Sequence, residues 1–417
     1  MARRQILDRD HMNSRRVLCA AIFALSLTTG VQANPFKMDL IPPALPVAAS
    51  AQAAPFRIGL ILPMSGPFGS TGKQIDAAVR LYIAQNGTNV AGREVQVLLR
   101  DDQGVPELTR RLAQELIAVE KVDVLGGFGI TPGALAVAPL LTQSRTPGVI
   151  MAAATSGIVA SSPYFVRTSY ALQQSASTMA DWAHKSKVGT VMTMVSDYGP
   201  GIDAETAFAA RVEANGGRLL ERLRIPVPNP ELGPFLQRVR DQQPDALFVF
   251  VPSGSAASLM KQFAERGLDK AGIRLIGDGG VTDDDLLDQM GDEAIGVVTS
   301  FHYSAAHASA LNRRFVSEFA ASNKGMRPNF MAVGGYDGMR VIYKALEETG
   351  GTGKGDALVA AMRGQTFESP RGPVTIDAGT GEIIQDVYVR RVEKRAGKLW
   401  NIEIDANKAV RDRSSKN

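Results

Sequence analysis

The sequence contains almost no cysteine. Of its 417 residues only Cys19 is a cysteine, and it lies within an apolar N-terminal segment. If that segment is removed on export, no disulfide, thiol nucleophile or zinc–thiolate site can form in the remaining chain. A lipid-attachment cysteine would follow the apolar run, whereas Cys19 lies early in it, directly after Leu18. The remaining chain is long enough to bury a large core, divided between two domains or lobes.

The sequence also lacks a strong charge of either sign and a second long apolar run. The net charge is +4, and residues 1–53 hold six of the 46 Lys and Arg and three of the 42 Asp and Glu. The remainder is therefore almost neutral and has no long basic run, so nucleic acid is not an expected partner. No later apolar run reaches the roughly 18 residues of a membrane helix. The mature protein is expected to be soluble.

The N-terminus has the pattern of a cleaved export signal. Arg15 and Arg16 precede the apolar run 17–30, and small residues follow at 31–33, "VQA". This predicts a signal peptide over 1–33, with "AQA" (51–53) as a second candidate cleavage site and a Pro/Ala-rich leader over 34–55. Met12 is a candidate true start. The alternative interpretation of the apolar run is a membrane anchor.

Nucleotide-binding motifs are missing, although one stretch looks similar to one. "SGPFGSTGKQ" (65–74) follows an apolar run and precedes a helical pattern, as a phosphate-binding loop does. That loop requires G-x-x-x-x-G-K-S/T, but Pro67 replaces the first glycine and Gln74 replaces the hydroxyl residue. "GGFGITPG" (126–133) lacks the spacing of a dinucleotide fingerprint. No nucleotide hydrolysis and no cofactor are predicted, and Lys73 is expected in solvent.

Catalytic and metal-binding patterns are missing as well. There is no G-x-S-x-G and no H-E-x-x-H, and the histidines after the N-terminal segment are only His184, His302 and His307. His184 is expected on a helix surface, and the other two have no acid at ligand spacing. The run "DDD" (283–285) is interpreted as acids at a helix N-terminus. No catalytic residue and no metal site are proposed, so the chain is not predicted to be an enzyme.

Apolar runs alternate with helical patterns from Phe56 onward. Strands are predicted at "FRIGLIL", "EVQVLLRD", "VDVLGG", "PGVIMAA", "VGTVMTMVS", "ALFVFV", "IRLIG" and "AIGVVTS". Helices are predicted near 71–87, 105–120, 132–143, 172–186, 201–215, 231–241 and 254–266. Two successive blocks of this kind predict two α/β lobes with parallel sheets. After residue 300 we expect helices near 307–323, 329–348 and 353–362, and then a β-rich end.

Polar loops follow three of the predicted strands. They are "SGPFGSTG", "GGFGITPG" and "AAATSG", which are rich in small and hydroxyl-bearing residues. Open α/β sheets bind ligands at the carboxyl ends of their strands. Hydroxyl groups and helix N-termini at such an edge can bind a carboxylate without Lys or Arg.

These loops, in this order, resemble the type I periplasmic solute-binding proteins of ABC importers, in the branched-chain amino-acid (Leu/Ile/Val) class. The similar stretches cover 56–393 and include "RIGLILPMSGPFGSTGKQIDAAVRL", "TPGVIMAAATS", "SDYGPG", "PDALFVFVPSG" and "GGYDGMRVIYKALEETGG". The resemblance implies two Rossmann-like lobes joined by a three-crossover hinge, with the ligand in the cleft between them. Lobe one would be 56–171 and 303–371, lobe two 172–302 and 372–410, and 411–417 a polar tail. Its partners would be a small solute and a membrane permease, and the protein would be a periplasmic monomer.

The resemblance also implies ligand-binding residues. Hydroxyls and amides after the third and fourth strands bind the ligand carboxylate in that family, the first loop contacts its side chain, and a tyrosine of the second lobe closes over it. The corresponding residues here are Phe68, Ser70, Thr131, Ala153, Thr155, Ser156 and Tyr198. Amino-acid binders add an acid for the α-ammonium, for which Asp278 is the candidate. Arg167 is expected to belong to the hinge.

The resemblance implies a small carboxylate-bearing solute, with a branched-chain or related amino acid as the leading expectation and an amine-free aromatic carboxylate or an amide, for transport or sensing, as the alternative. If Asp278 faces the cleft, an amino acid is expected; if it does not, an amine-free carboxylate such as an aromatic acid fits equally well. The competing classes are an exported enzyme and a sensory ligand-binding domain. The enzyme would need a catalytic cluster, and the sensor would usually be fused to a signalling module.

Overall fold

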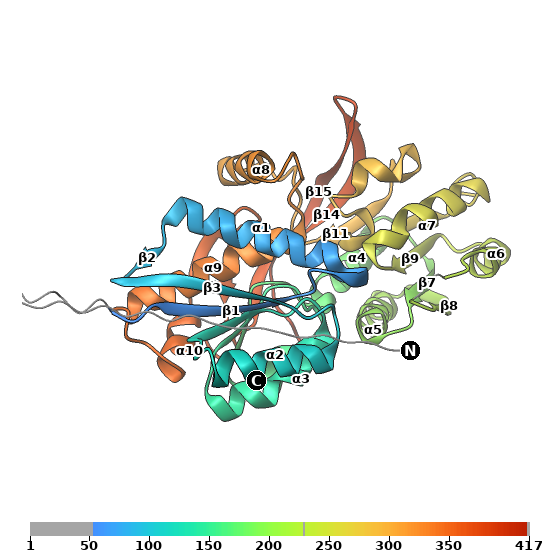
Figure 1. The fold of residues 1–417 in the computed structure, drawn as a ribbon. Helices are drawn as coiled ribbons and strands as arrows, with labels where there is room; N and C mark the ends of the chain where they lie inside the picture. The colour runs from blue at the N-terminus through green and yellow to red at the C-terminus, as the bar shows by residue number, and fades with distance from the viewer. Residues whose placement is uncertain (1–52, 228–229, 415–417) are drawn as a thin grey trace, which may run out of the picture. The chain divides into compact units, whose positions relative to one another are not determined.

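The computed structural model describes residues 53–227 and 230–414 (Figure 1). The predicted export signal and almost all of the predicted leader lie outside the described residues, as do 415–417. Within the described ranges, no helix has both the length and the apolar character that crossing a bilayer requires.

The first lobe is built on a six-stranded sheet. Its strand order is β2-β3-β1-β4-β5-β6, and all neighbours are parallel except β2 and β3. The strands are β1 (Phe56–Leu62), β2 (Asn89–Val90), β3 (Arg93–Asp101), β4 (Val124–Gly127), β5 (Gly148–Ile150) and β6 (Phe165–Arg167). Its helices are α1 (Gly69–Asn86), α2 (Pro106–Ala118), α3 (Thr131–Ser144), α8 (Ala310–Ser322), α9 (Phe330–Glu348) and α10 (Asp356–Met362), with short 3-10 turns at Gly66–Phe68 and Ile158–Ser161.

Alternation along β1 explains how this sheet is covered. Ile58, Leu60 and Leu62 pack into a core with α1 and α9, whereas Ile61 packs into a core with α2 and α3. Successive side chains of a strand point to opposite faces, so a strand that is apolar throughout can be buried on both sides. Figure 1 shows α1 above the first sheet and α2 and α3 below it.

The second lobe is built on a nine-stranded sheet. Its order is β12-β13-β14-β11-β10-β9-β7-β8, with β15 paired to β14. The strands are β7 (Thr190–Ser196), β8 (Arg218–Ile225), β9 (Ala246–Phe250), β10 (Arg274–Asp278), β11 (Val298–Phe301), β12 (Thr366–Ser369), β13 (Gly372–Ile376), β14 (Ile383–Arg395) and β15 (Lys398–Val410). Its helices are α4 (Leu172–Lys185), α5 (Gly199–Ala214), α6 (Gly233–Gln242) and α7 (Ser253–Glu265), with 3-10 turns at Gly279–Thr282, Leu287–Met290 and Asp292–Ala294.

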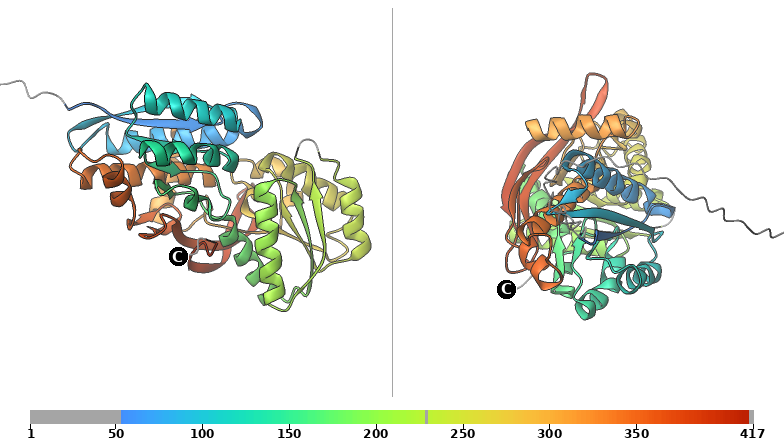
Figure 2. Two further views of the ribbon diagram at one scale, coloured as in Figure 1. Left: turned by 90° about the horizontal axis from the view of Figure 1, so that it is seen from below. Right: turned by 60° about the vertical axis from the view of Figure 1, so that its left-hand side comes forward.

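The same alternation covers the second sheet. Phe248 and Phe250 pack with α4 and α5, whereas Leu247 and Val249 pack with α6 and α7. The left view of Figure 2 shows helices on both faces of this sheet. The predicted fold class, two α/β lobes with mostly parallel sheets, is therefore confirmed.

The predicted strands and helices are confirmed with small shifts at their ends, but β2, β6 and β8 were not predicted. β8 (Arg218–Ile225) is an edge strand with the sequence "RLLERLRI". Its four charged residues break up the apolar run that identified the other strands. A half-exposed edge strand tolerates such residues, because only one side of it is paired.

The chain passes between the lobes after β6, after β11 and again after α10. At the last crossing β12 pairs with β13 in the second sheet, although Phe367 of β12 packs into the core of the first lobe. This segment contacts both lobes, and the expected boundary at residue 371 stays a prediction.

Strand β14 also contributes to both lobes. Ile383, at its start, is buried in the core around β1, while Val389 and Val392 are buried in the two cores of the second sheet. Its pairing with β15 changes register between Gln385 and Val387.

Candidate ligand-binding site

A cavity of about 380 Å³ lies between the strand-end loops of the two lobes. Its walls include the loops after β1, β4 and β5 of the first lobe and after β7, β9 and β10 of the second. A larger groove of about 910 Å³ lies between α4, α5 and the β14–β15 hairpin. The smaller cavity is the candidate site, because ligands of open α/β sheets bind at the carboxyl ends of the strands.

Six of the eight residues expected to bind ligand line this cavity. They are Phe68, Ser70, Thr131, Ala153, Tyr198 and Asp278. Thr155 and Ser156 do not line it, but Thr155 supports a residue that does: the Thr131 and Thr155 hydroxyls are 2.8 Å apart. The Ser156 amide and hydroxyl instead donate to Asp203 of α5, at 2.8 and 2.9 Å. The roles of all eight in binding stay predictions.

Thr131 is the first residue of helix α3, and Pro132 follows it. The backbone N–H that proline lacks has no partner within the helix in the first turn. The loop can therefore end in "TP" without weakening the helix. Thr131 is buried at the N-terminus of α3, which carries a partial positive charge. The first lobe therefore provides a hydroxyl and a helix N-terminus at the cavity wall.

Arg167 fixes the turn behind Thr131. Its guanidinium is fully buried, donates to the carbonyl of Thr155 at 2.8 Å and to that of Tyr170 at 2.8 Å, and lies 3.1 Å from Glu382. Burial raises the pKa of Glu382 to about 7, against the opposing effect of Arg167. Arg167 thus connects β6, the loop after β5 and the residue before β14, and it does not line the cavity.

Asp278 faces the cavity from the end of β10. The Ser175 hydroxyl donates to its Oδ2 at 2.6 Å, and the Gly280 amide donates to its Oδ1 at 3.0 Å. Burial raises the pKa of Asp278 to about 6, although both hydrogen bonds act in the opposite direction. This carboxylate is therefore held in place but is costly to keep ionised.

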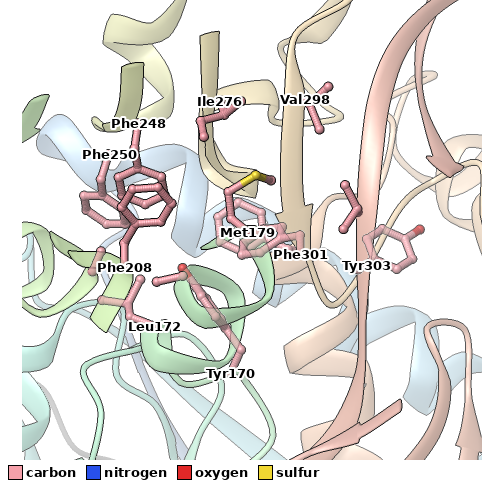
Figure 3. Packing of buried hydrophobic residues seen from close by; sticks show 14 of the residues in the cluster. Tyr170, Leu172, Met179, Phe208, Phe248, Phe250, Ile276, Val298, Phe301 and Tyr303 are labelled. Atoms are coloured by element: carbon pink, nitrogen blue, oxygen red, sulfur yellow. The ribbon is translucent and has the colours of Figure 1, made fainter. Parts of the chain in front are cut away.

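Five aromatic residues contribute to the cavity wall. The aromatic lining residues are Phe68, Tyr170, Tyr198, Phe250 and Phe330. The Tyr170 ring stacks on His302 with centroids 4.8 Å apart and meets Phe301 edge-on, also at 4.8 Å. Figure 3 shows Tyr170 beside Phe301 and Leu172 within the buried cluster. Among the described residues that line the cavity, none is Lys, Arg or His.

Asn329 of the first lobe and Asp283 of the second join the lobes across this wall. Asn329 caps helix α9 of the first lobe through its side-chain oxygen, and its amide donates to both oxygens of Asp283 at 3.0 and 3.1 Å. Asp283, in the second lobe, is buried, and burial raises its pKa to about 6. The run "DDD" was interpreted as acids at a helix N-terminus, but Asp283 and Asp284 are buried in contacts with Asn329 and Asn401 of other segments. Asn329 precedes the helical pattern "FMAV", and an asparagine in that place is a sequence signal for a helix cap. Nothing in the sequence indicated that its amide also bonds to Asp283.

Hydrogen bonds to Asp101 shape the loop after β1. Asp101 accepts hydrogen bonds from the Met64 amide at 2.9 Å and the Ser65 hydroxyl at 2.7 Å. A side chain at Gly72 would collide with the Pro63 carbonyl, so this glycine allows α1 to start close to β1. Lys73 is exposed, as expected.

Two lobes of this topology enclosing a cavity at their strand ends define a type I periplasmic binding fold. The chain belongs to the periplasmic binding protein family, which matches residues 55–398. A relative in Brucella melitensis, "Leu/Ile/Val-binding protein homolog 6", is 42% identical over 361 residues, or 86% of this chain and 93% of that protein.

Two solved structures are similar over almost the whole described part. One is a solute-binding protein of an ABC transporter from Rhodopseudomonas palustris BisB5 in complex with 3,4-dihydroxybenzoic acid, with 54% identity and a TM-score of 0.84; the match covers 87% of this chain and 99% of that one. The other is an R. palustris solute-binding protein in complex with 4-hydroxybenzoate, with 39% identity, a TM-score of 0.83 and coverage of 86% and 99%. The protein is thus a substrate-binding protein of an ABC transporter, in a family of solute receptors rather than enzymes. The family is periplasmic.

Proposed function

We propose that this protein captures an aromatic carboxylate of the benzoate type and delivers it to the permease of an ABC importer. The observation that carries the proposal is the composition of the cavity wall: five aromatic side chains, a threonine at a helix N-terminus and no cation among the described lining residues. The benzoate-type ligands of two relatives at 54% and 39% identity support it.

The first-lobe wall suits the carboxylate. Thr131 offers a hydroxyl at the N-terminus of the 14-residue helix α3, where the helix dipole favours a negative charge. The hydroxyl of Thr155, 2.8 Å away, can donate to Thr131 and leave the Thr131 proton for the ligand. Charge-assisted hydrogen bonds of this kind can bind a carboxylate without a neighbouring Arg or Lys.

The aromatic residues suit a flat ring. Offset or edge-on aromatic pairs contribute about 0.5–1.5 kcal/mol beyond the burial of their area. A cavity of about 380 Å³ lies within the range of small-molecule sites, about 300–1,000 Å³. An aliphatic amino-acid side chain would bury less surface against these rings than a benzoate would.

One observation favours a second candidate. Asp278 lines the cavity, and an acid in this place was the sequence criterion for an α-amino acid. The name of the B. melitensis relative points the same way. A branched-chain amino acid is therefore the alternative solute.

A thermal-shift panel separates the two candidates. Benzoate, 4-hydroxybenzoate, 3,4-dihydroxybenzoate, L-leucine and L-valine are each added to the mature protein. A specific ligand at 100 times its Kd stabilises the folded state by about 2.7 kcal/mol. We expect a rise in melting temperature with the aromatic acids and none with the amino acids. The reverse result would replace the proposal by the alternative.

The transport role has its own tests. A monomer is expected, and light scattering coupled to gel filtration would contradict it by finding a dimer at micromolar concentration. The bound acid should be recovered chemically unchanged by NMR, since a receptor has no turnover. Export to the periplasm is checked by fractionating cells and sequencing the mature N-terminus.

A further inference from the structure

We propose that Asp278, Tyr170 and Tyr198 form a subsite for a hydroxyl group on the ligand ring, so that the protein selects phenolic acids over unsubstituted benzoate. This inference rests on the proposed function and makes its substrate class narrower. It starts from three polar side chains that line the same cavity. Their hydrogen-bonding groups are not all paired within the described residues.

Asp278 retains acceptor capacity towards the cavity. Its Oδ2 accepts from the Ser175 hydroxyl and its Oδ1 from the Gly280 amide, and the Gly279 amide also contributes a hydrogen bond. An ionised carboxylate offers about four acceptor positions. These bonds leave acceptor capacity unused, and the residue is only 2% exposed. A donor that reaches this carboxylate has little water to compete with.

The two tyrosines complement this acceptor with donors. Within residues 53–227 and 230–414, neither phenol has a hydrogen-bond partner, although Tyr170 is only 5% exposed. Burial first, and then the nearby charge of Asp278, raise the pKa of both phenols well above the usual range. Both hydroxyls therefore stay protonated at neutral pH and lie within electrostatic range of the same carboxylate.

A ring hydroxyl matches this set better than the other common polar groups do. It can donate to Asp278 and accept from a tyrosine, which uses both kinds of group. A ligand carboxylate only accepts and would be repelled by Asp278, so it belongs at Thr131. An α-ammonium only donates, which suits Asp278 but leaves the protons of Tyr170 and Tyr198 without an acceptor.

The subsite is also rigid before the ligand arrives. The Tyr170 ring is stacked on His302, meets Phe301 edge-on at 4.8 Å and meets Phe330 edge-on at 6.1 Å. Figure 3 shows this ring within the buried cluster, with Leu172 on one side and Phe301 on the other. Groups that are already fixed lose little conformational entropy on binding, so the hydroxyl can contribute most of its hydrogen-bond energy to selectivity.

The test is isothermal titration of the full mature protein with benzoate, 4-hydroxybenzoate, 3,4-dihydroxybenzoate and L-leucine. The expected result is binding of at least one hydroxylated acid about tenfold or more tighter than benzoate, as a hydrogen bond to a charged group implies. In Asp278→Asn this preference should fall to about threefold or less, with benzoate affinity little changed. The control is Asp386→Asn, a buried acid bonded to Lys408 and Ala409 outside the cavity, which should keep the preference.

Tyr198→Phe gives a second measurement if Asp278→Asn folds poorly. It should weaken the hydroxylated acids more than benzoate, whereas Tyr343→Phe, whose hydroxyl bonds to the Gly87 carbonyl away from the cavity, should change neither. Equal wild-type affinity for benzoate and both hydroxylated acids would overturn the inference and leave the proposed function intact. An equal loss for all acids in both cavity variants would also overturn it. Binding of leucine alone would overturn the proposed function itself.

Discussion

The side-chain amide of Asn329 bonds one lobe to the other. Removing this amide tests directly whether that contact holds the lobes together. The amide lies 3.0 and 3.1 Å from the two oxygens of Asp283 in the other lobe, and both residues are buried. The same side chain caps α9, since its oxygen accepts from the amides of Met331 and Ala332 at 2.9 and 3.3 Å. Asn329→Ser is the informative change, because serine keeps the cap and removes only the contact between lobes.

The expected effect is on ligand affinity more than on folding. A hydrogen bond to a charged group contributes about 1.5–3 kcal/mol, and the lower figure applies here, because Asp283 regains water when the lobes separate. About 1.5 kcal/mol corresponds to a roughly 12-fold weaker Kd. The loss should be larger at pH 7.5 than at pH 5, since the pKa of Asp283 is about 6 and only its ionised form benefits from two donors.

Titration calorimetry with 3,4-dihydroxybenzoate measures the affinity, and small-angle scattering without ligand measures the separation of the lobes. The radius of gyration of the unliganded variant should increase. The control is Ser309→Ala, which removes the cap of α8 and should lower the melting temperature without changing affinity. If Asn329→Ser leaves both the Kd and the radius of gyration unchanged, the contact with Asp283 does not hold the lobes together.

Three further predictions use other parts of the molecule. Thr131→Val should weaken binding of a carboxylate by about 1–3 kcal/mol, and unchanged calorimetric affinity would remove this hydroxyl from the site. Asp278 and Asp283 have folded-state pKa values of about 6, above their unfolded values, so they bind more protons when folded. The free energy of unfolding should therefore fall by about 1.4 kcal/mol for each of them between pH 5 and pH 7.5, and urea melts that show a rise over this range would contradict the assignment. Gly334→Ala would place a methyl group against the Met151 carbonyl and should lower stability by about 1–3 kcal/mol; a variant that melts like the wild type would show that α9 can move away.

The fold followed from the sequence wherever local periodicity matched burial. β1 and β9 are apolar at nearly every position because helices cover both of their faces. β8 was missed for the opposite reason, since Arg218, Glu221, Arg222 and Arg224 lie on an edge strand. Sequence propensity and hydrophobic pattern reflect how buried a segment is. An exposed edge strand carries charged residues as a loop does, so its sequence cannot be distinguished from that of a loop.

The site was partly predictable for a geometric reason. Loops at the carboxyl ends of parallel strands meet at one edge, so Phe68, Thr131 and Tyr198 could be brought together without a structure. The pairing of Ser156 with Asp203 and of Asn329 with Asp283 could not. These contacts depend on how one lobe faces the other, and no periodicity within either lobe encodes that.

Strand β14 gives the hinge a mechanical property. Because one continuous strand is anchored in the first-lobe core at Ile383 and in the second-lobe cores at Val389 and Val392, the lobes cannot rotate apart without twisting its backbone. The register change between Gln385 and Val387 places an irregular, more easily bent point between those anchors. The stiffness of this short stretch should therefore set how quickly the receptor opens, and substitutions there should change the ligand dissociation rate without touching any atom of the ligand.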